Sequence, residues 1–326
     1  MQFFWQVRQM ATMSLKIYDP RDFPAYLPKL NNLYDELFSG GKGFRSKLIH
    51  MLAESLKIDS STEHLLGQTI EFIHNSSLLH DDLIDRSHLR RGKTAAWLKF
   101  TPEYAVLAGD YLLARVMVNL SSHGNIKLVQ LTAQAISDLL EGEWLQDSLV
   151  GDFDVDLSQL DRVHNLKTAS LFKWCLRAPF VALNRNEPSL HTALEEMGSL
   201  LGQLFQRSDD LLDYNIRNTE GKNPLGDLKS GYLNSFAAFA TREISAQKRK
   251  ELKGCDTLEG FKAFLGGEAV FDQRVAEFDE KNKFLIELYR HQLLQLKSHL
   301  QESEMDLLGK LEPLTEILYW RRKPSS

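Results

Sequence analysis

TEHLLGQTIEFIHNSSLLHDDLID, residues 62–85, is the clearest helical pattern in this chain of 326 residues. Apolar side chains lie on almost every side of it, from Leu65 near its start to Ile84 at its end. A helix that is apolar all round is a central element rather than a surface one. We therefore expect a buried central helix over 62–85, with Ser61 or Thr62 as its N-cap.

The remainder of the chain repeats this helical character, and prolines are absent from 29–101, 103–178 and 225–312. Prolines at 20, 24 and 28 indicate an extended lead-in, and polar residues 86–94 indicate a loop. Length alone suggests about two domains, but no linker divides the chain. We predict an all-α fold with a tail over 1–20 and one domain over 21–326. The sequence turns helical from about Leu30 up to the break GGKG at 40–43, and a second helix after that break carries Leu48, Ile49, Leu52 and Leu56. Further helical periodicity covers roughly 62–85, 102–120, 125–150, 158–180, 189–217, 231–250, 257–300 and 303–320.

Composition excludes several classes of function. Lys and Arg number 39 against 44 Asp and Glu, so the basic excess of a nucleic-acid-binding protein is missing. No uncharged apolar run approaches the 18 residues that a membrane span needs. The N-terminus lacks a secretory pattern, and the two cysteines cannot form a disulfide framework. We expect a cytoplasmic protein without a transmembrane segment, in which Cys175 is buried as a small hydrophobe.

Two acidic trios interrupt this apolar pattern, each with carboxylates at i, i+1 and i+4. Like charges inside an apolar helix repel one another and lose solvation. Divalent cations relieve both costs, and Mg²⁺ prefers oxygen ligands. A solvated acidic patch is the alternative, which two such trios in apolar helices make less attractive. The trios are Asp81, Asp82 and Asp85 in LLHDDLIDR, and Asp209, Asp210 and Asp213 in FQRSDDLLDY.

Basic side chains recur near the first trio and near the glycine pair at 40–41, where the backbone can approach a phosphate closely. Arg90 and Arg91 follow the predicted central helix, and Lys42 and Arg45 follow the glycines. His74 lies two turns before Asp81 on the same helix face. A single such histidine is more often a core residue, and basic loops are usually solvated. Their joint spacing makes them candidates for binding a diphosphate.

The ordered motifs resemble those of the trans-isoprenyl diphosphate synthases, the polyprenyl synthetase family. The resemblance runs from Gly40 to about Asp227, with a weaker similarity in YWRRK near the C-terminus. It implies an isoprenoid-synthase-type helical bundle around a deep central cavity, usually as a homodimer. It also implies condensation of isopentenyl diphosphate with an allylic diphosphate through an allylic carbocation. The motifs are GGKGFR, LLHDDLIDRSHLRRGKTAAW, LAGDYLL, LLEGEWLQ, LKTASLF, LFQRSDDLLDY and GKNPLGDL.

The resemblance also implies roles for individual residues. Three carboxylates would hold Mg²⁺, with Mn²⁺ as an alternative: Asp81, Asp85 and Asp209. Three more would support them: Asp82, Asp210 and Asp213. The allylic diphosphate would contact Arg90, Lys167 and Lys222. The diphosphate of isopentenyl diphosphate would contact Lys42, Arg45, His74 and Arg91. Dipoles near the developing carbocation would come from Thr168 and Gln206.

Two motifs depart from the family pattern. Gly43 replaces a frequent arginine in GGKGFR, which removes one cation. In DLKSGYLNSF, Tyr232 replaces a phosphate-facing lysine, and Ser230 replaces a glutamate. These replacements put one diphosphate contact in question. The segment 240–326 matches the family only in its helical pattern.

Product length can be argued from the predicted central helix. Ser77 and Ser76 lie four and five residues before Asp81. Family members that stop at farnesyl diphosphate commonly carry an aromatic residue there, which closes the bottom of the product cavity and forms its floor. Two serines would leave the cavity for the growing prenyl chain open at that level, so we expect products of C20 or longer. Deeper floor candidates are Ile73, Phe72 and Tyr111.

Three other functions stay open. A class I terpene cyclase would use an aspartate-rich metal motif, but it would not need Lys42, Arg45 and His74 to bind isopentenyl diphosphate. A catalytically silent partner subunit of a heteromeric prenyl synthase would typically lose an aspartate-rich motif, although Tyr232 keeps this alternative in play. A plain helical scaffold would not retain two acidic trios inside apolar helices.

Overall fold

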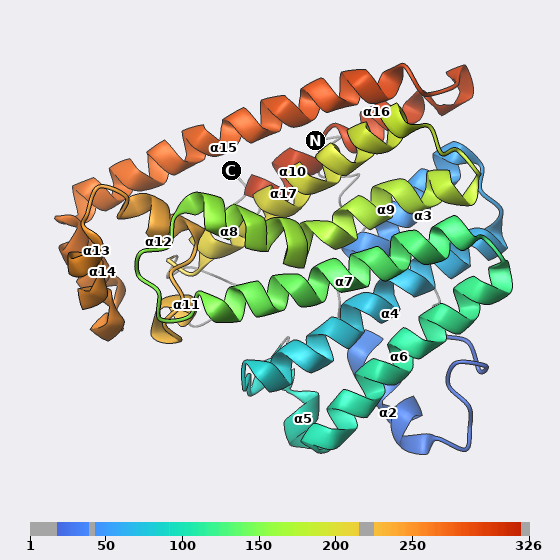
Figure 1. The fold of residues 1–326 in the computed structure, drawn as a ribbon, viewed down its shortest axis with the longest axis horizontal. Helices are drawn as coiled ribbons and strands as arrows, with labels where there is room; N and C mark the ends of the chain where they lie inside the picture. The colour runs from blue at the N-terminus through green and yellow to red at the C-terminus, as the bar shows by residue number, and fades with distance from the viewer. Residues whose placement is uncertain (1–17, 39–42, 91, 215–224, 321–326) are drawn as a thin grey trace. The chain divides into compact units, whose positions relative to one another are not determined.

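The computed structural model describes residues 18–38, 43–90, 92–214 and 225–320 (Figure 1). Over these residues the chain is helical except for one two-stranded hairpin, which confirms the predicted all-α fold. The contacts divide the chain into two compact units. The first comprises Met1–Gln134 and Trp174–Glu187, and the second comprises Ala135–Lys173 and Pro188–Ser326. None of the described helices has the length and apolarity needed to cross a bilayer.

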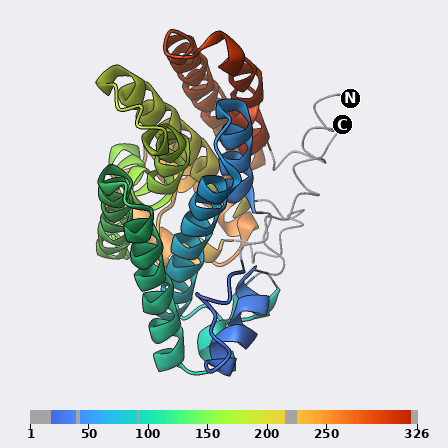
Figure 2. The same cartoon turned by 90° about the vertical axis from the view of Figure 1, so that its right-hand side faces the viewer.

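In the first unit, α4 (Ser60–Ile84) packs along α6 (Pro102–His123) and α3 (Phe44–Leu56), as both views show (Figure 1, Figure 2). Its side chains Leu66, Ile70 and Phe72 are fully buried. The prediction of a central apolar helix is therefore confirmed. The other helices before α6 are α2 (Pro28–Phe38) and α5 (Ala96–Lys99).

The start of α4 differs from the prediction by about two residues. Its N-cap is Asp59, whose carboxylate accepts hydrogen bonds from the backbone N–H groups of Ser61 and Thr62, each at 3.0 Å. The carboxylate satisfies donors that have no partner inside the helix. Side-chain hydrogen bonds from Ser61 and Thr62, with smaller effects of the backbone N–H groups, hold the pKa of Asp59 well below its ordinary value. The proposed caps Ser61 and Thr62 were wrong because the acidic residue just before them takes that position.

The segment predicted as a loop contains a short hairpin. Strand β1 (Leu89–Arg90) pairs antiparallel with β2 (Lys93–Thr94), with Leu89 opposite Thr94 and Arg90 opposite Lys93. Gly92 has φ 75°, a left-handed conformation that glycine adopts without steric cost. Two-residue turns favour such residues, so the hairpin follows from Gly92, which the sequence reasoning did not use.

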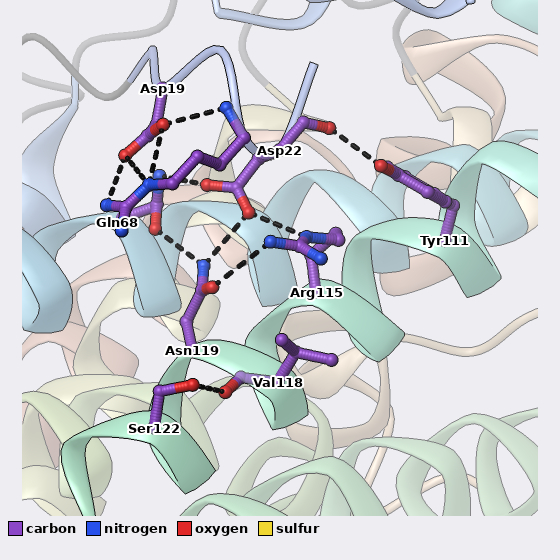
Figure 3. Close-up of polar contacts among 9 residues, drawn as sticks. Asp19, Asp22, Gln68, Tyr111, Arg115, Val118, Asn119 and Ser122 are labelled. Carbon is purple, nitrogen blue, oxygen red and sulfur yellow. Dashed lines mark hydrogen bonds and ion pairs between the residues drawn. The ribbon is translucent and has the colours of Figure 1, made fainter. Parts of the chain in front are cut away.

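The lead-in before α2 is turned rather than extended, and Asp22 anchors it to α4 and α6 (Figure 3). This carboxylate is buried and accepts from Arg115 Nε at 2.7 Å, Gln68 Nε2 at 2.8 Å and Asn119 Nδ2 at 3.1 Å. The Tyr111 hydroxyl donates to the Asp22 backbone carbonyl at 2.9 Å. An ion pair completed by these hydrogen bonds offsets the cost of burying the charge.

The elements after α6 contribute to the second unit, except for residues 126–134 and 174–187, which belong to the first unit. The second unit is built around α10, which contacts α15, α17 and η1. Buried apolar residues from 149 to 319, including Phe236, Phe261 and Phe278, form its core. These elements are α7 (Ile126–Ser148), α8 (Leu157–Val163), the π-helix η1 (His164–Thr168), α9 (Ala169–Ala182), α10 (Pro188–Leu212), α11 (Gly226–Lys229), α12 (Ser235–Ala240), α13 (Ala246–Arg249), the 3-10 helix η2 (Lys250–Gly254), α14 (Leu258–Leu265), α15 (Glu268–Lys297), the 3-10 helix η3 (Glu302–Glu304), α16 (Asp306–Leu311) and α17 (Leu314–Tyr319).

Several predicted helices are subdivided here. The pattern over 158–180 holds a π-helical turn, and 231–250 separates into α12, α13 and η2. The pattern over 257–300 breaks at Gly266 and Gly267, whose φ angles of 110° and 112° lie outside the helical range. The pattern over 303–320 breaks at Pro313, which precedes α17. Periodicity located the apolar faces but not these interruptions.

Two glycines let α10 approach its neighbours closely. A Cβ atom on Gly202 would lie 2.4 Å from Cα of Ala169, the residue directly after η1. A Cβ on Gly198 would lie 2.5 Å from Cα of Lys173. Neither contact tolerates a side chain, because both opposing atoms belong to the backbone.

We expect Gly202→Ala to destabilise the protein by about 2 kcal/mol, because the added methyl group overpacks the α10 contact. Gly309→Ala in α16 is the matched control, since a Cβ there meets no atom within 4 Å. That substitution should stabilise by up to about 1 kcal/mol through helix propensity. Chemical denaturation of both variants checks the prediction, and equal stabilities would contradict it.

Candidate functional site

The first acidic trio lies in the last turn of α4. Asp81 is half-buried, Asp82 is buried at 4% exposure, and Asp85 is exposed as the C-cap. The helix macrodipole is negative at this end, so it adds to the repulsion among the three carboxylates. The local electrostatics therefore favour a cation here.

One such cation is Arg90, on β1 of the hairpin. Its Nε donates to Asp82 Oδ1 at 2.8 Å, and its Nη2 forms a second hydrogen bond with the same oxygen. Burial alone lowers the pKa of this guanidinium, but Asp82, Asp81 and Asp85 together raise it above its ordinary value. The hairpin thus brings a predicted diphosphate-binding arginine to the first acidic trio.

Arg45 and His74 also meet, as the shared role implied for them requires. Arg45 Nη1 lies 3.2 Å from His74 Nε2, which joins the first turn of α3 to the middle of α4. His74 is half-buried, so it is not simply a core histidine. Three further predicted ligands of diphosphates, Lys42, Arg91 and Lys222, lie outside the described residues.

The departure at Gly43 has a physical explanation. Gly43 is the N-cap of α3 with φ 54° and ψ 35°, in the left-handed region. A Cβ here would lie 3.3 Å from Ser46 Oγ. Because side-chain-bearing residues are strained in this conformation, the backbone of this chain favours glycine over the arginine that the resemblance implies at this position.

The second acidic trio lies at the end of α10. Asp210 is buried, accepts from Gln206 Nε2 at 3.0 Å and from the Ser235 backbone N–H at 2.9 Å, and accepts from the Ser235 hydroxyl. Burial raises its pKa, although these hydrogen bonds oppose the shift. Asp213 accepts from the backbone N–H groups of Gly226 at 3.0 Å and Asp227 at 3.1 Å. Protein donors thus hold two members of this trio.

Lys167 and Thr168 lie in the π-helical turn η1. Such turns often occur at functional sites. Lys167 Nζ forms an ion pair with Glu143 of α7. The Thr168 hydroxyl donates to Gln206 Oε1 at 3.1 Å, which brings the two predicted dipoles together. The half-buried Asp209 lies on α10, three residues beyond Gln206.

Tyr232 brings no positive charge to its position. It is half-buried, and burial, with added effects of Asp210 and Asp227, raises the pKa of its phenol. It therefore stays neutral at physiological pH. Ser230, at the position of the family's glutamate, donates its hydroxyl to the Asp227 carbonyl at 2.7 Å.

The proposed chain-length residues lie on different sides of α4. Ser76 is buried and donates its hydroxyl to the Gly109 carbonyl of α6 at 2.9 Å. Ser77 is half-buried, and its hydroxyl donates to the His74 carbonyl. Ile73 is buried.

An apolar cavity of about 480 Å³ lies between the start of α2 and α6, and Tyr111 lines it. The deep central cavity stays a prediction.

The structure adds three groups that the sequence reasoning did not select. They are Ser235, Glu143 and His164. His164 Nε2 lies 3.7 Å from Asp210 Oδ2, and burial lowers the pKa of this imidazole to about 3. Glu143 belongs to the quoted motif LLEGEWLQ, so a signal for it existed. Ser235 likewise belongs to the quoted motif DLKSGYLNSF, but its partner Asp210 is distant in the sequence. His164 carried no signal.

The donor set fits a metal ion that binds together with a substrate. Among the described residues, no three His, Cys, Asp or Glu side chains converge to hold an ion by themselves. Mg²⁺ in phosphate-handling proteins usually takes one or two carboxylates and completes its shell with phosphate oxygens and water. Asp81 and Asp85, one turn apart, offer carboxylate oxygens of this kind.

Comparison with known proteins identifies the family. Residues 27–261 match the family model for polyprenyl synthetase. The chain belongs to the polyprenyl synthetase family. It is 35% identical over 193 residues to octaprenyl diphosphate synthase of Escherichia coli, a match that covers 59% of each chain. Over 238 residues it is 35% identical to the chloroplastic solanesyl diphosphate synthase 1 of Arabidopsis thaliana, covering 70% of this chain and 58% of that one. The chain therefore spans less than two thirds of the length of these curated relatives.

Solved structures of polyprenyl synthetase relatives match nearly the whole chain. A decaprenyl diphosphate synthase from Rhodobacter capsulatus gives a TM-score of 0.77 at 25% identity, covering 99% of this chain and 95% of that one. A polyprenyl synthase from Caulobacter crescentus, complexed with calcium and isoprenyl diphosphate, gives 0.71 at 26% identity with the same coverage. The family and fold predictions are confirmed. A cytoplasmic location stays a prediction, since several relatives are chloroplastic.

We expect Arg90→Ala to destabilise the protein by about 2 kcal/mol, because it leaves the buried Asp82 carboxylate without its ionic partner. The figure is below that for a fully buried pair because the Arg90 side chain is 39% exposed. In the double variant Asp82→Asn/Arg90→Ala most of the loss should be recovered, since an amide needs no counter-charge. Thermal unfolding checks this, and an unchanged Arg90→Ala stability would contradict a structural role for the pair.

Proposed function

We propose that this chain is a trans-prenyltransferase that condenses isopentenyl diphosphate head-to-tail with an allylic diphosphate. The observation that carries the proposal is the acidic trio at the negative end of α4, with Arg90 bound to Asp82, in a chain of the polyprenyl synthetase family. A cation relieves the repulsion within this arrangement, and a divalent metal ion, which also binds the diphosphate, supplies one.

Three carboxylates of the chain would hold the metal ions: Asp81, Asp85 and Asp209. Bound Mg²⁺ would offset the negative charge that grows on the leaving diphosphate. Three further carboxylates, which accept hydrogen bonds from protein donors, would support these ligands: Asp82, Asp210 and Asp213. Mn²⁺ offers the same oxygen chemistry and could replace Mg²⁺.

The basic residues would divide between the two substrates. Arg45 and His74, which lie 3.2 Å apart, would bind the diphosphate of isopentenyl diphosphate together with Lys42 and Arg91. The leaving diphosphate of the allylic substrate would contact Arg90, Lys167 and Lys222. Cations fixed before the reaction stabilise the charge that develops during C–O cleavage without reorganising.

The allylic cation left by this cleavage would face the oxygen dipoles of Thr168 and Gln206. The alkene of isopentenyl diphosphate attacks the cation, and loss of a proton to the released diphosphate gives a chain longer by five carbons. Water has to be excluded, because it would convert the cation to an alcohol.

We propose that the product is longer than C20. Curated relatives of this chain are named octaprenyl, solanesyl and decaprenyl diphosphate synthases. The small, half-buried side chain of Ser77 supports this, because an aromatic residue there would fill space beside α4. Ser76, packed against α6, would act from the layer behind it. Ile73 is a candidate for the next layer.

The test is a product assay on purified protein with isopentenyl diphosphate and dimethylallyl, geranyl or farnesyl diphosphate, with Mg²⁺ or a chelator. We expect Mg²⁺-dependent elongation to products longer than C20. Asp81→Asn should lower kcat by at least about a hundredfold, because it removes a ligand charge. An Asp81→Asn variant with near wild-type turnover would overturn the metal assignment.

Ser77→Phe should shorten the main product by several isoprene units, because the ring occupies space beside α4. Ser77→Ala is the matched control, which removes the hydroxyl without filling that space, and should leave the product length unchanged. Chain lengths are resolved after dephosphorylation. The same product distribution in both variants would show that the residues that stop chain growth lie elsewhere.

A second candidate is a silent partner subunit of a heteromeric synthase. The neutral Tyr232 at a lysine position favours it, and one relative is a decaprenyl-diphosphate synthase subunit 1 of Schizosaccharomyces pombe. An inactive folded protein in the product assay, with activity gained in Tyr232→Lys, would support this candidate. A class I terpene cyclase would have no use for the Arg45–His74 pair, and would release cyclic hydrocarbons in the same assay.

A further inference from the structure

Four side chains of the second unit form a chain of hydrogen bonds with a fixed direction. The Ser235 hydroxyl donates to Asp210 Oδ2, and Gln206 Nε2 donates to Asp210 Oδ1 at 3.0 Å. At the far end, the Thr168 hydroxyl donates to Gln206 Oε1 at 3.1 Å. We call this set, Ser235, Asp210, Gln206 and Thr168, the amide relay.

Asp210 decides which way the Gln206 amide points. The two ends of an amide have nearly the same shape, but one end donates hydrogen bonds and the other accepts them. Asp210 Oδ1 accepts a hydrogen bond from Gln206 Nε2, so Asp210 binds the NH₂ end of the amide. The amide oxygen of Gln206 is thereby turned toward Thr168.

The orientation of Gln206 in turn decides what Thr168 presents. The hydroxyl has a single proton, and that proton is donated to Gln206 Oε1. The Thr168 oxygen therefore offers lone pairs to any neighbouring ligand. With the amide reversed, the NH₂ group would face Thr168 and its partial positive charge would repel a cation.

Ser235 holds the carboxylate that sets this direction. Its backbone N–H, 2.9 Å from Asp210 Oδ2, and its hydroxyl bind the same oxygen, so the carboxylate plane is fixed from the α12 side. Ser235 is fully buried and Asp210 is 2% exposed, so water does not readily replace a lost donor. The two ends of the relay lie 67 positions apart in the sequence.

We propose that Ser235 is a positioning residue for prenyl transfer. Through Asp210 it fixes the Gln206 amide so that oxygen lone pairs, and not N–H groups, face the allylic cation. This inference rests on the proposed function, since it concerns the cation of that reaction. It assigns Ser235 a role in limiting the capture of the cation by water, which a purely structural hydroxyl would not have.

The experiment compares wild type with Ser235→Ala in steady-state elongation and in primer hydrolysis without isopentenyl diphosphate. Ser235→Ala should lower kcat about tenfold, the usual scale for losing one hydrogen bond to a charged group. KM for both substrates should change less than about twofold, because the diphosphate contacts stay. The share of ionised primer released as alcohol should rise severalfold.

Two variants separate positioning from stability. Ser235→Thr keeps the hydroxyl and should restore both kcat and the low alcohol share. Thr241→Val removes another buried hydroxyl at the end of α12, one that donates to the Ala237 carbonyl within its own helix. It should lower thermal stability about as much as Ser235→Ala while leaving kcat and the alcohol share unchanged.

The Gln206→Leu background tests whether Ser235 acts through Gln206. If it does, Ser235→Ala should cause no further loss there, whereas independent effects would multiply. Crystal structures of wild type and Ser235→Ala give a readout that needs no turnover. The distance from Gln206 Nε2 to Asp210 Oδ1 should exceed hydrogen-bonding range in the variant.

The possible outcomes are distinguishable. A wild-type protein that does not elongate any primer overturns the proposed function, and an unchanged Gln206–Asp210 contact in Ser235→Ala then overturns the relay as well. A wild type that elongates, with Ser235→Ala equal to Thr241→Val in kcat and alcohol share, overturns the positioning role alone.

Discussion

The cost of placing carboxylates in apolar helices governs the candidate site. Each acidic trio sits in the last turns of a long helix, where desolvation and the helix dipole both oppose negative charge. The structure meets part of that cost with its own donors. Arg90 binds Asp82, the α12 segment and Gln206 bind Asp210, and the start of α11 binds Asp213.

These internal partners also connect the site to the fold. The hairpin is joined to α4 by Arg90, and the starts of α11 and α12 are joined to α10 by Asp213 and Asp210. Each short element is therefore positioned by a carboxylate of an aspartate-rich motif. A substitution in either motif should for this reason change both binding and local structure.

Close backbone packing provides the second constraint on the same region. Gly142 of α7 approaches the backbone of Lys167 in η1 so closely that a Cβ would lie 2.6 Å from the Lys167 nitrogen, and Gly202 of α10 does the same at Ala169. The π-helical turn that carries Lys167 and Thr168 is thus held between two glycine-bearing helices. Tight packing of this kind keeps the two side chains in defined positions.

Local properties of the sequence determined the fold class, the central helix and the acidic and basic residues of the site. Periodicity depends only on near neighbours, and for that reason helix α4 was anticipated. The family resemblance implied a shared role for Arg45 and His74, and the structure places them 3.2 Å apart. Only the tertiary structure decided that Asp210 and Asp213 bind protein donors, that Arg90 reaches Asp82 through a hairpin, and that Ser235 binds Asp210. Those contacts join residues far apart in the chain, and hydrogen bonds between such residues form only once the helices have packed.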